Sequence, residues 1–376
     1  MSMLFNTSCD RLDDFTGGAD DSTLPTVTDL PIIIAHRGAQ SVFPEHTLEA
    51  YPRAIKLGAD FIEPDLVMTS DSVLIARHEP FLSGTTNISD LPEFAEFLTT
   101  KELDGVMVTD WFTTDLTLAQ IKTLRARQSF AGRSTSFDDQ FEIPTFQEII
   151  DLATSVTTNS GNLVGLYSEM KHPLFHNDLD LPIEDETLTV LAANNLDNVD
   201  APVFVQCFEV APLQNLNARS SVRLVQLILT VGLDDDGNLI FDTSNGVAPA
   251  LGSPYNFIRN NDSRTYEFFI TAEGMEFTAS YADGIGPWKP FIIPFTRDAD
   301  GNVDEILPAT DFVELAHANN LLVHPYTFRN EDERWSGGDA RSEYFLFFDA
   351  GVDDVFTDYT LEGVNALQAW AEENVQ

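Results

Sequence analysis

The sequence predicts an α/β fold in which eight parallel strands close into a barrel. Short apolar runs rich in β-branched residues recur along the chain, and helical patterns lie between several of them. This alternation is typical of a parallel sheet covered by helices. Eight such runs favour a closed barrel over an open sheet, and barrels of this class often hold more than about 250 residues in one domain.

The elements follow from the apolar patterns in chain order. The predicted barrel strands are residues 32–36, 61–68, 163–171, 203–208, 223–229, 281–286, 321–326 and 354–359. A further run at 73–78 follows a "TSDS" turn and is predicted to be the hairpin partner of the second strand. The predicted helices are 46–58, 145–156, 310–320 and 360–373.

The spacing of these elements predicts the domain organisation. Residues 1–28 are rich in Asp, Thr, Ser and Gly and are expected to form a flexible acidic tail, whereas 29–376 are expected to form one barrel domain. The gap after the hairpin partner is too long for one crossover, so an insertion is predicted at about 82–142. A second long excursion covers 231–280, and long segments of this kind often cover active sites.

The chain carries a large negative charge. It has 20 Lys and Arg residues against 61 Asp and Glu residues, a formal net charge of −41. Such a protein cannot displace counterions from a nucleic acid, so nucleic-acid binding is excluded and docking on anionic lipid is disfavoured. The charge also suggests a saline habitat, because the Debye length falls to about 3 Å in molar salt. Stable membrane insertion is not expected, since no run of about 18 apolar residues occurs.

Polar residues stand at the carboxyl ends of the predicted strands, which is where barrel enzymes place their active sites. In a strand, residues i and i+2 share a face. Four runs end in pairs at this spacing: Glu63 and Asp65, Glu169 and Lys171, Gln206 and Phe208, His324 and Tyr326. A shared pocket explains several such pairs better than separate capping arrangements do, although strand alternation alone would also place the last two pairs there.

Three of these residues, Glu63, Asp65 and Glu169, are candidate metal ligands. Neighbouring carboxylates cannot all remain ionised without a cation. An all-oxygen set favours Ca²⁺ or Mg²⁺ over zinc. The alternative is that each carboxylate pairs with Lys or Arg, but the chain has about three acids for every base.

Two histidines and two cations complete the set. His36 follows the first strand and His78 follows the hairpin partner, and imidazole titrates near neutral pH, as acid/base catalysis requires. Arg37 and Lys171 supply a planar fork and a point charge that suit a phosphate group. Together with a cation site, these residues indicate phosphoryl chemistry.

The ordered motifs resemble one known family. The series "AHRGA", "PEHTLEAY", "GADFIEPDLVMTSD" and "LIARHEP", followed by "YSEMKHP", "VQCFE", "YADGIGP", "LVHPYTFR" and "GVDDVFTDY", is similar to glycerophosphodiester phosphodiesterases of the larger periplasmic type. The resemblance implies a TIM barrel with a segment inserted after the second strand. It also implies hydrolysis of a small glycerophosphodiester to an alcohol and sn-glycerol 3-phosphate, in the periplasm or outside the cell.

The resemblance assigns roles to residues at matching positions. It makes His36 and His78 the catalytic histidines, and it places Arg37 and Lys171 at the phosphate. Glu45 supports the arginine or the metal at the substrate site. The implied metal ligands are Glu63, Asp65 and Glu169, usually for Ca²⁺, with Mg²⁺ as an alternative. Gln206, Phe208 and Tyr326 are expected to line the substrate pocket.

One residue departs from the family pattern. Glu79 stands where an aspartate usually follows the second histidine, which adds a methylene and puts the orientation of His78 in question. Two alternatives to the implied function remain. One is a phosphodiesterase for a lysophospholipid or sphingomyelin, which an exposed apolar lip at the barrel mouth would favour. The other is a non-catalytic binding protein on the same barrel.

Overall fold

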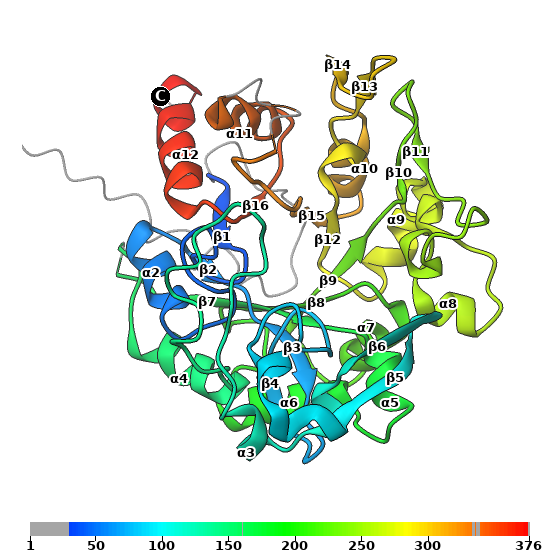
Figure 1. Cartoon of the computed structure of the whole chain (residues 1–376). Coiled ribbons are helices and arrows are strands. Elements are labelled where there is room, and N and C mark those ends of the chain that lie inside the picture. The colour runs from blue at the N-terminus through cyan, green and yellow to red at the C-terminus, as the bar shows by residue number, and fades with distance from the viewer. Residues whose placement is uncertain (1–29, 160, 333–334, 336–338, 375–376) are drawn as a thin grey trace, which may run out of the picture.

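The structure is a computed structural model that describes residues 30–159, 161–332, 335 and 339–374 (Figure 1). The predicted N-terminal tail, 1–28, lies outside the described residues. Within them, no helix is both long and apolar enough to cross a membrane.

The predicted parallel barrel is present. Each barrel strand pairs in parallel with the next, in the order β16, β1, β2, β7, β8, β9, β12 and β15. The strands in chain order are β1 (Ile32–Ala35), β2 (Phe61–Ile62), β3 (Asp65–Met68), β7 (Gly165–Met170), β8 (Val203–Cys207), β9 (Arg223–Ile228), β12 (Gly284–Pro287), β15 (Leu322–Val323) and β16 (Asp354–Thr357).

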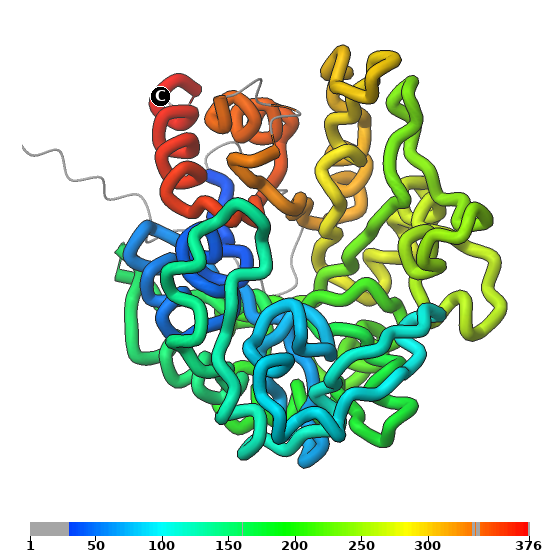
Figure 2. The backbone as a smooth tube through the Cα atoms, in the orientation of Figure 1, coloured from blue at the N-terminus to red at the C-terminus, as the bar shows by residue number. Residues whose placement is uncertain are grey.

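Backbone hydrogen bonds close the barrel between β15 and β16. The amide of Asp353 donates to the carbonyl of Val323 at 3.1 Å, and the amide of Phe356 donates to the carbonyl of Pro325 at 3.2 Å. Because β16 also pairs with β1, the beginning and the end of the described chain lie side by side, in blue and red in Figure 2. Closure leaves one carboxyl-terminal rim, on which the strand ends meet.

The second predicted strand is broken. Residues 61–68 form β2 and β3, separated by Glu63 and Pro64, because proline has no N–H to donate to a neighbouring strand. The carbonyl of Pro64 still accepts the amide of Glu169 at 3.0 Å. β3 pairs with β7 on one side and, as predicted, with an antiparallel partner on the other, β4 (Leu74–Ala76).

Helices cover the outside of the barrel (Figure 1). They are α2 (Ala50–Leu57), α3 (Leu118–Ile121), α4 (Phe146–Ser155), α5 (Pro173–Asn177), α6 (Ile183–Ala193), α7 (Val210–Asn217), α8 (Tyr255–Arg259), α9 (Ala272–Ala279), α10 (Phe312–His317), α11 (Ala340–Asp349) and α12 (Thr360–Asn374). Short 3₁₀ turns are η1 (Ile88–Asp90), η2 (Pro92–Phe97), η3 (Thr113–Asp115), η4 (Pro249–Leu251), η5 (Tyr266–Ile270) and η6 (Lys289–Phe291).

The first helix starts later than predicted. The pattern predicted a helix over 46–58, but α2 begins at Ala50, since His46 has a left-handed backbone with φ of 54° and the Thr47 hydroxyl accepts the amide of Ala50. Ahead of it, Gly38 has φ of 84°, and a Cβ there would lie 2.9 Å from the Cβ of Ala50. Glycine is therefore required here for a tight turn packed on α2.

Two long segments rise beside the barrel mouth. After β4, the predicted insertion carries an antiparallel hairpin, β5 (Leu98–Leu103) and β6 (Val106–Trp111), and packs its own apolar cluster against Val67 and Ile75. The second excursion carries the hairpin β10 (Gly232–Leu233) and β11 (Leu239–Ile240). It contacts the hairpin β13 (Phe295–Arg297) and β14 (Val303–Ile306) through a backbone hydrogen bond from Arg297 to Asp235.

Candidate active site

A pocket of about 240 Å³ opens at the carboxyl ends of the barrel strands. Most of the predicted site residues line it: His36, Arg37, Glu63, His78, Glu169, Lys171, Gln206, Phe208 and Tyr326. The sequence analysis did not assign the remaining lining residues to the site, which are Leu227, Leu229, Trp288, Thr327, Arg329 and Phe356. The lining therefore combines polar and charged groups with aromatic and aliphatic ones.

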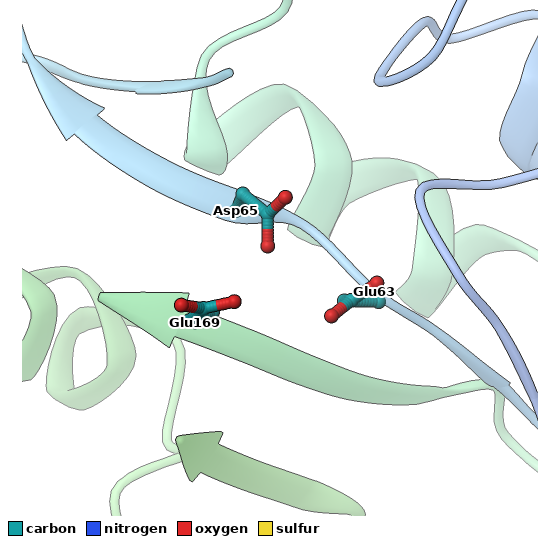
Figure 3. Close-up of side chains that lie close together, drawn as sticks. All are labelled: Glu63, Asp65 and Glu169. Atoms are coloured by element: carbon teal, nitrogen blue, oxygen red, sulfur yellow. The ribbon is translucent and has the colours of Figure 1, made fainter. Parts of the chain in front are cut away.

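The three predicted metal ligands lie together (Figure 3). Glu63, Asp65 and Glu169 each offer a carboxylate oxygen within 4.8 Å of the other two, and all three are buried. The break at Pro64 places Glu63 before β3 and Asp65 at its start, opposite Glu169 on β7 in the strand register. The parallel ladder itself therefore brings the carboxylates face to face.

The protonation of these carboxylates fits a site built for a cation. Burial and the nearby Asp65 raise the pKa of Glu63 well above its ordinary value, and burial raises the pKa of Glu169 to about 7. Although burial opposes it, His46 and Arg37 hold the pKa of Asp65 well below its ordinary value. The Oδ1 atom of Asp65 is buried and accepts no hydrogen bond from any described residue. An all-oxygen set with one free buried oxygen fits a hard divalent cation.

Arg37 and Lys171 place positive charge beside the carboxylate cluster. The Arg37 guanidinium donates from Nη1 to Glu45 Oε2 at 3.1 Å, and its Nε lies 3.2 Å from Asp65 Oδ2. Glu45 is 1% exposed and lies behind the pocket wall, so its contact is with the arginine. Lys171 donates from Nζ to Glu169 Oε1 at 2.8 Å.

His36 is held by a carboxylate that the sequence analysis did not assign. Its Nδ1 lies 2.6 Å from Asp358 Oδ1, and Asp358, just after β16, is fully buried. The Gln40 amide also donates to this oxygen, at 2.7 Å. Burial and Arg37 lower the pKa of His36 to about 3, although Asp358 opposes the shift. His36 is therefore neutral near pH 7, with the Nδ1 proton on the Asp358 side and Nε2 free to act in the pocket.

His78 has a similar arrangement with Glu79. Its Nδ1 lies 2.9 Å from Glu79 Oε1, and Lys171 Nζ lies 3.2 Å from its Nε2. Burial, Arg37 and Lys171 lower the pKa of His78 to about 4. The extra methylene of Glu79 therefore does not remove the carboxylate from the histidine.

Two other histidines do not line the pocket. His324 was a candidate for the pocket, but it is fully buried inside the barrel, where it contacts Tyr167 Oη at 2.6 Å and Asp354 Oδ2 at 3.0 Å. The parallel ladder continues past His324, whose amide donates to Ile285, to Tyr326, whose amide donates to Pro287. Tyr326 lines the pocket, and His324, two residues earlier in the chain, lies deeper in the barrel. His46 is fully buried and contacts Asp65 Oδ2 at 2.9 Å.

Three residues beside His36 were missed by the sequence analysis. Arg329 donates to Asp358 Oδ2 at 2.8 Å, and Arg133 donates to the same oxygen at 2.7 Å. Arg133 comes from the insertion, far from Asp358 in sequence, and no local pattern marks it. Asp358 itself ends a predicted strand, so the rule that found Glu169 also applies to it.

An α/β barrel whose mouth combines a carboxylate cluster with histidines and cations has the architecture of a phosphoric diester hydrolase. A family model described as the glycerophosphoryl diester phosphodiesterase family matches residues 36–362. A glycerophosphodiester phosphodiesterase of Arabidopsis thaliana is 33% identical over 352 residues, which cover 89% of this chain and 86% of the relative. The chain therefore belongs to the glycerophosphoryl diester phosphodiesterase family, and it is a hydrolase.

Other comparisons agree with this assignment. A glycerophosphodiester phosphodiesterase of Haemophilus influenzae is 29% identical over 355 residues, with 90% of each chain covered. A solved phosphodiesterase of Oleispira antarctica, in complex with the product sn-glycerol-3-phosphate, has a TM-score of 0.57 and 18% identity, covering 90% of this chain and 97% of that chain. This structural likeness confirms the barrel fold.

Proposed function

We propose that the protein hydrolyses small glycerophosphodiesters to sn-glycerol 3-phosphate and an alcohol, with His36 and His78 as proton-transfer groups and a divalent cation at the carboxylates. The carboxylate cluster beside two cations and two neutral histidines carries this proposal, because all of these groups except Asp65 line one pocket, and Asp65 lies against Glu63 and Glu169. The product seen in the Oleispira antarctica structure supports the same substrate class.

The two histidines supply the acid and the base. Both are neutral near pH 7 without substrate, and each has Nδ1 directed to a carboxylate, so proton transfer falls to Nε2, which in His78 also lies 3.2 Å from Lys171 Nζ. One Nε2 accepts the proton of the attacking hydroxyl, which is the glycerol 2-hydroxyl if a cyclic phosphate forms first. The other histidine first takes up a proton from solvent at Nε2, beside the anionic substrate, and then donates it to the oxygen of the departing alcohol.

The cations orient the phosphate. Arg37 contacts Glu45 and Asp65, and Lys171 contacts Glu169, so both side chains are held in place at the pocket. A fixed donor that faces the phosphoryl oxygens stabilises the charge that develops there in the transition state. When bound, a divalent cation held by Glu63, Asp65 and Glu169 would add Lewis-acid stabilisation to the same oxygens. We propose Ca²⁺ as this ion and Mg²⁺ as the alternative.

The dimensions of the pocket favour a small alcohol over a lipid. Its volume of about 240 Å³ lies below the range of about 300–1,000 Å³ that is usual for drug-sized ligands. On the exposed face of the β5–β6 hairpin, Leu98 and Met107 are 47% and 64% exposed, but the hydrogen-bonded pair Thr100 and Thr109 separates them. This hairpin therefore offers no continuous apolar lip for a lysophospholipid.

The test is release of sn-glycerol 3-phosphate from glycerophosphocholine by the purified protein, with Ca²⁺, with Mg²⁺ and with chelator, in high salt. We expect release that chelator abolishes and that Ca²⁺ restores. His36→Ala and His78→Ala are each expected to remove most turnover while the thermal unfolding curve stays cooperative. Activity that resists chelator would refute the role of the cation. Near-normal turnover in His36→Ala or His78→Ala would refute the catalytic role of the histidine replaced. If no product is released although Ca²⁺ is bound, the result would favour a binding protein.

The cellular location is part of the same proposal. We propose a periplasmic or secreted enzyme, as the resemblance to the larger periplasmic type implies. Cell fractionation of the native host with an antibody against the protein tests this, and recovery of the protein with cytoplasmic markers would contradict it.

A further inference from the structure

A chain of contacts leads from His78 to the turn of the inserted β5–β6 hairpin. Glu79 bridges two histidines: its Oε1 lies 2.9 Å from His78 Nδ1, and its Oε2 lies 3.2 Å from His172 Nε2. On its other side, His172 Nδ1 lies 2.7 Å from Asp104 Oδ2. Asp104 stands in the hairpin turn between Leu103 and Val106. Four side chains from three separate segments thus form one line into the pocket.

The charges along this line alternate. Although burial opposes it, hydrogen bonds to Asp104 and Glu79 raise the pKa of His172 to about 10, so it is an imidazolium near neutral pH. Although burial opposes ionisation, His172 and His78 hold the pKa of Glu79 well below its ordinary value. Both nitrogens of His172 therefore donate, one to Asp104 and one to Glu79, and the Glu79 carboxylate has one oxygen left for His78.

This arrangement determines which nitrogen of His78 carries the proton. With Glu79 ionised and accepting at Nδ1, the neutral imidazole places its lone pair on Nε2, where Lys171 donates at 3.2 Å. A histidine in the other tautomer would present an N–H to the ammonium of Lys171, which is unfavourable. A carboxylate that fixes a catalytic imidazole in this way has a large effect on turnover in other hydrolases.

Both outer residues are held away from bulk solvent. Asp104 and Gly105 have φ of 48° and 84°, as the two-residue turn of the hairpin requires, so the turn fixes the backbone of Asp104. The side chains of His172 and Asp104 are 19% and 14% exposed, so the pair is shielded from most of the solvent that weakens surface ion pairs.

We propose that Asp104 and His172 are positioning residues for His78, and that they act through Glu79. The inserted hairpin thereby helps to fix the orientation and tautomer of a histidine that belongs to the barrel. This inference rests on the proposed function, since it takes His78 to be a proton-transfer group.

Other charged groups near this line also affect the pKa values of its histidines. Glu209 and His176 also interact with His172, and Arg37, Lys171 and Glu45 interact with His78. None of these is changed in the test below. A change in the pH profile can therefore be assigned to the altered residue.

The test is a double-mutant cycle on kcat and KM for glycerophosphocholine, with saturating Ca²⁺. Asp104→Asn keeps the shape of the side chain and removes its charge, and Glu79→Gln removes the link to His78. We expect kcat to fall about tenfold in Asp104→Asn, the size expected when a hydrogen bond between charged groups is weakened, with KM nearly unchanged. In the Glu79→Gln background, Asp104→Asn should cause no further loss. The pH profile of kcat should shift in Asp104→Asn.

The hairpin offers a matched control. Glu102 lies two residues from Asp104 and contacts Tyr255 Oη at 3.2 Å, so Glu102→Gln makes the same charge change on the same hairpin without touching the line. We expect Glu102→Gln to have wild-type kcat and pH profile. If Asp104→Asn behaves like this control, or if its loss multiplies with that of Glu79→Gln, the positioning role is refuted.

Two further variants keep the test decisive. If Asp104→Asn does not fold, His172→Asn replaces it, because asparagine tolerates the left-handed backbone of His172, with φ of 46°, but is too short to bridge Glu79 and Asp104. It must show the same fall in kcat and the same lack of additivity with Glu79→Gln. His78→Ala separates the two hypotheses: near-normal turnover in it refutes the proposed function, whereas its inactivity alongside a normal Asp104→Asn refutes only the positioning role.

Discussion

Replacing Asp358 with asparagine should separate the chemistry of His36 from the stability of the barrel. Asp358 Oδ1 accepts from His36 and Gln40, and its Oδ2 accepts from Arg133 and Arg329, at distances between 2.6 and 2.8 Å. An asparagine has one acceptor oxygen and one amide that only donates. In either amide orientation, one pair of donors loses its acceptor, and the negative charge is removed from beside two guanidinium groups.

The expected magnitudes follow from these contacts. Two hydrogen bonds to charged groups, at about 1.5–3 kcal/mol each, place the loss of unfolding free energy at about 3–6 kcal/mol. That is a large share of the roughly 5–15 kcal/mol by which domains are stable, so the assay belongs at low temperature and high salt. For catalysis, an asparagine behind His36 no longer fixes the Nδ1 tautomer, and we expect kcat to fall by about 10²- to 10⁴-fold.

Asp354 provides the control for this experiment. It lies at the start of β16, four residues before Asp358, is 3% exposed, accepts the amide of Ile32 at 3.1 Å and lies 3.0 Å from His324 Nε2. Asp354→Asn therefore removes the same charge from the same segment, beside a histidine that does not line the pocket. We expect it to lower stability but to keep kcat. Equal losses of kcat in the two variants, measured on fully folded protein, would refute the reasoning about His36.

Two further predictions concern stability. Burial and Asp104 raise the pKa of Glu209 to about 8, so the stability that its protonated carboxyl contributes is fully present below the unfolded value of about 4.5 and is lost as pH rises through 8. Glu209→Gln should therefore be more stable than the wild type at pH 9, by an unfolding free energy of the order of 2–4 kcal/mol, and equally stable near pH 4. Equal unfolding curves of the two proteins at both pH values would contradict the shift. The net charge of −41 predicts that the midpoint of thermal unfolding rises when KCl is increased from about 0.05 M to 2 M, and an unchanged midpoint would argue against a saline habitat.

The barrel could be predicted because each buried strand appears in the sequence as a short run of apolar residues. The runs around Ile32, Val203 and Asp354 are buried on both faces, as parallel strands are, and each ends where the polar residues begin. The same rule located Glu169 and Lys171. It failed for His324, because the ladder continues to Tyr326 and the alternation of the run does not reveal which of the two residues reaches the pocket.

The partners of the histidines could not be predicted by local patterns. His36 and Asp358 are 322 positions apart, and Arg133 and Asp358 are 225 positions apart. Contacts of this kind depend on barrel closure and on the path of the insertion, and neither has a periodic signal. The insertion has little repeating apolar pattern, so Arg133 and Asp104 look like ordinary surface charges in the sequence. Glu79 was visible, but its second contact, with His172, needed the fold.

Both histidines contact a carboxylate that is itself contacted by a positively charged side chain, and the insertion takes part in both arrangements. Asp358 is a barrel carboxylate braced by Arg133, and Glu79 is a barrel carboxylate braced by His172 and Asp104. Each carboxylate needs a positive partner to stay ionised in a partly buried place, because burial alone favours its neutral form. Such partners are scarce in a chain with only 20 Lys and Arg residues. The insertion supplies Arg133 as the partner of Asp358, and its Asp104 helps to raise the pKa of His172, the partner of Glu79. The insertion therefore contributes charged groups to the surroundings of both carboxylates that contact the pocket histidines.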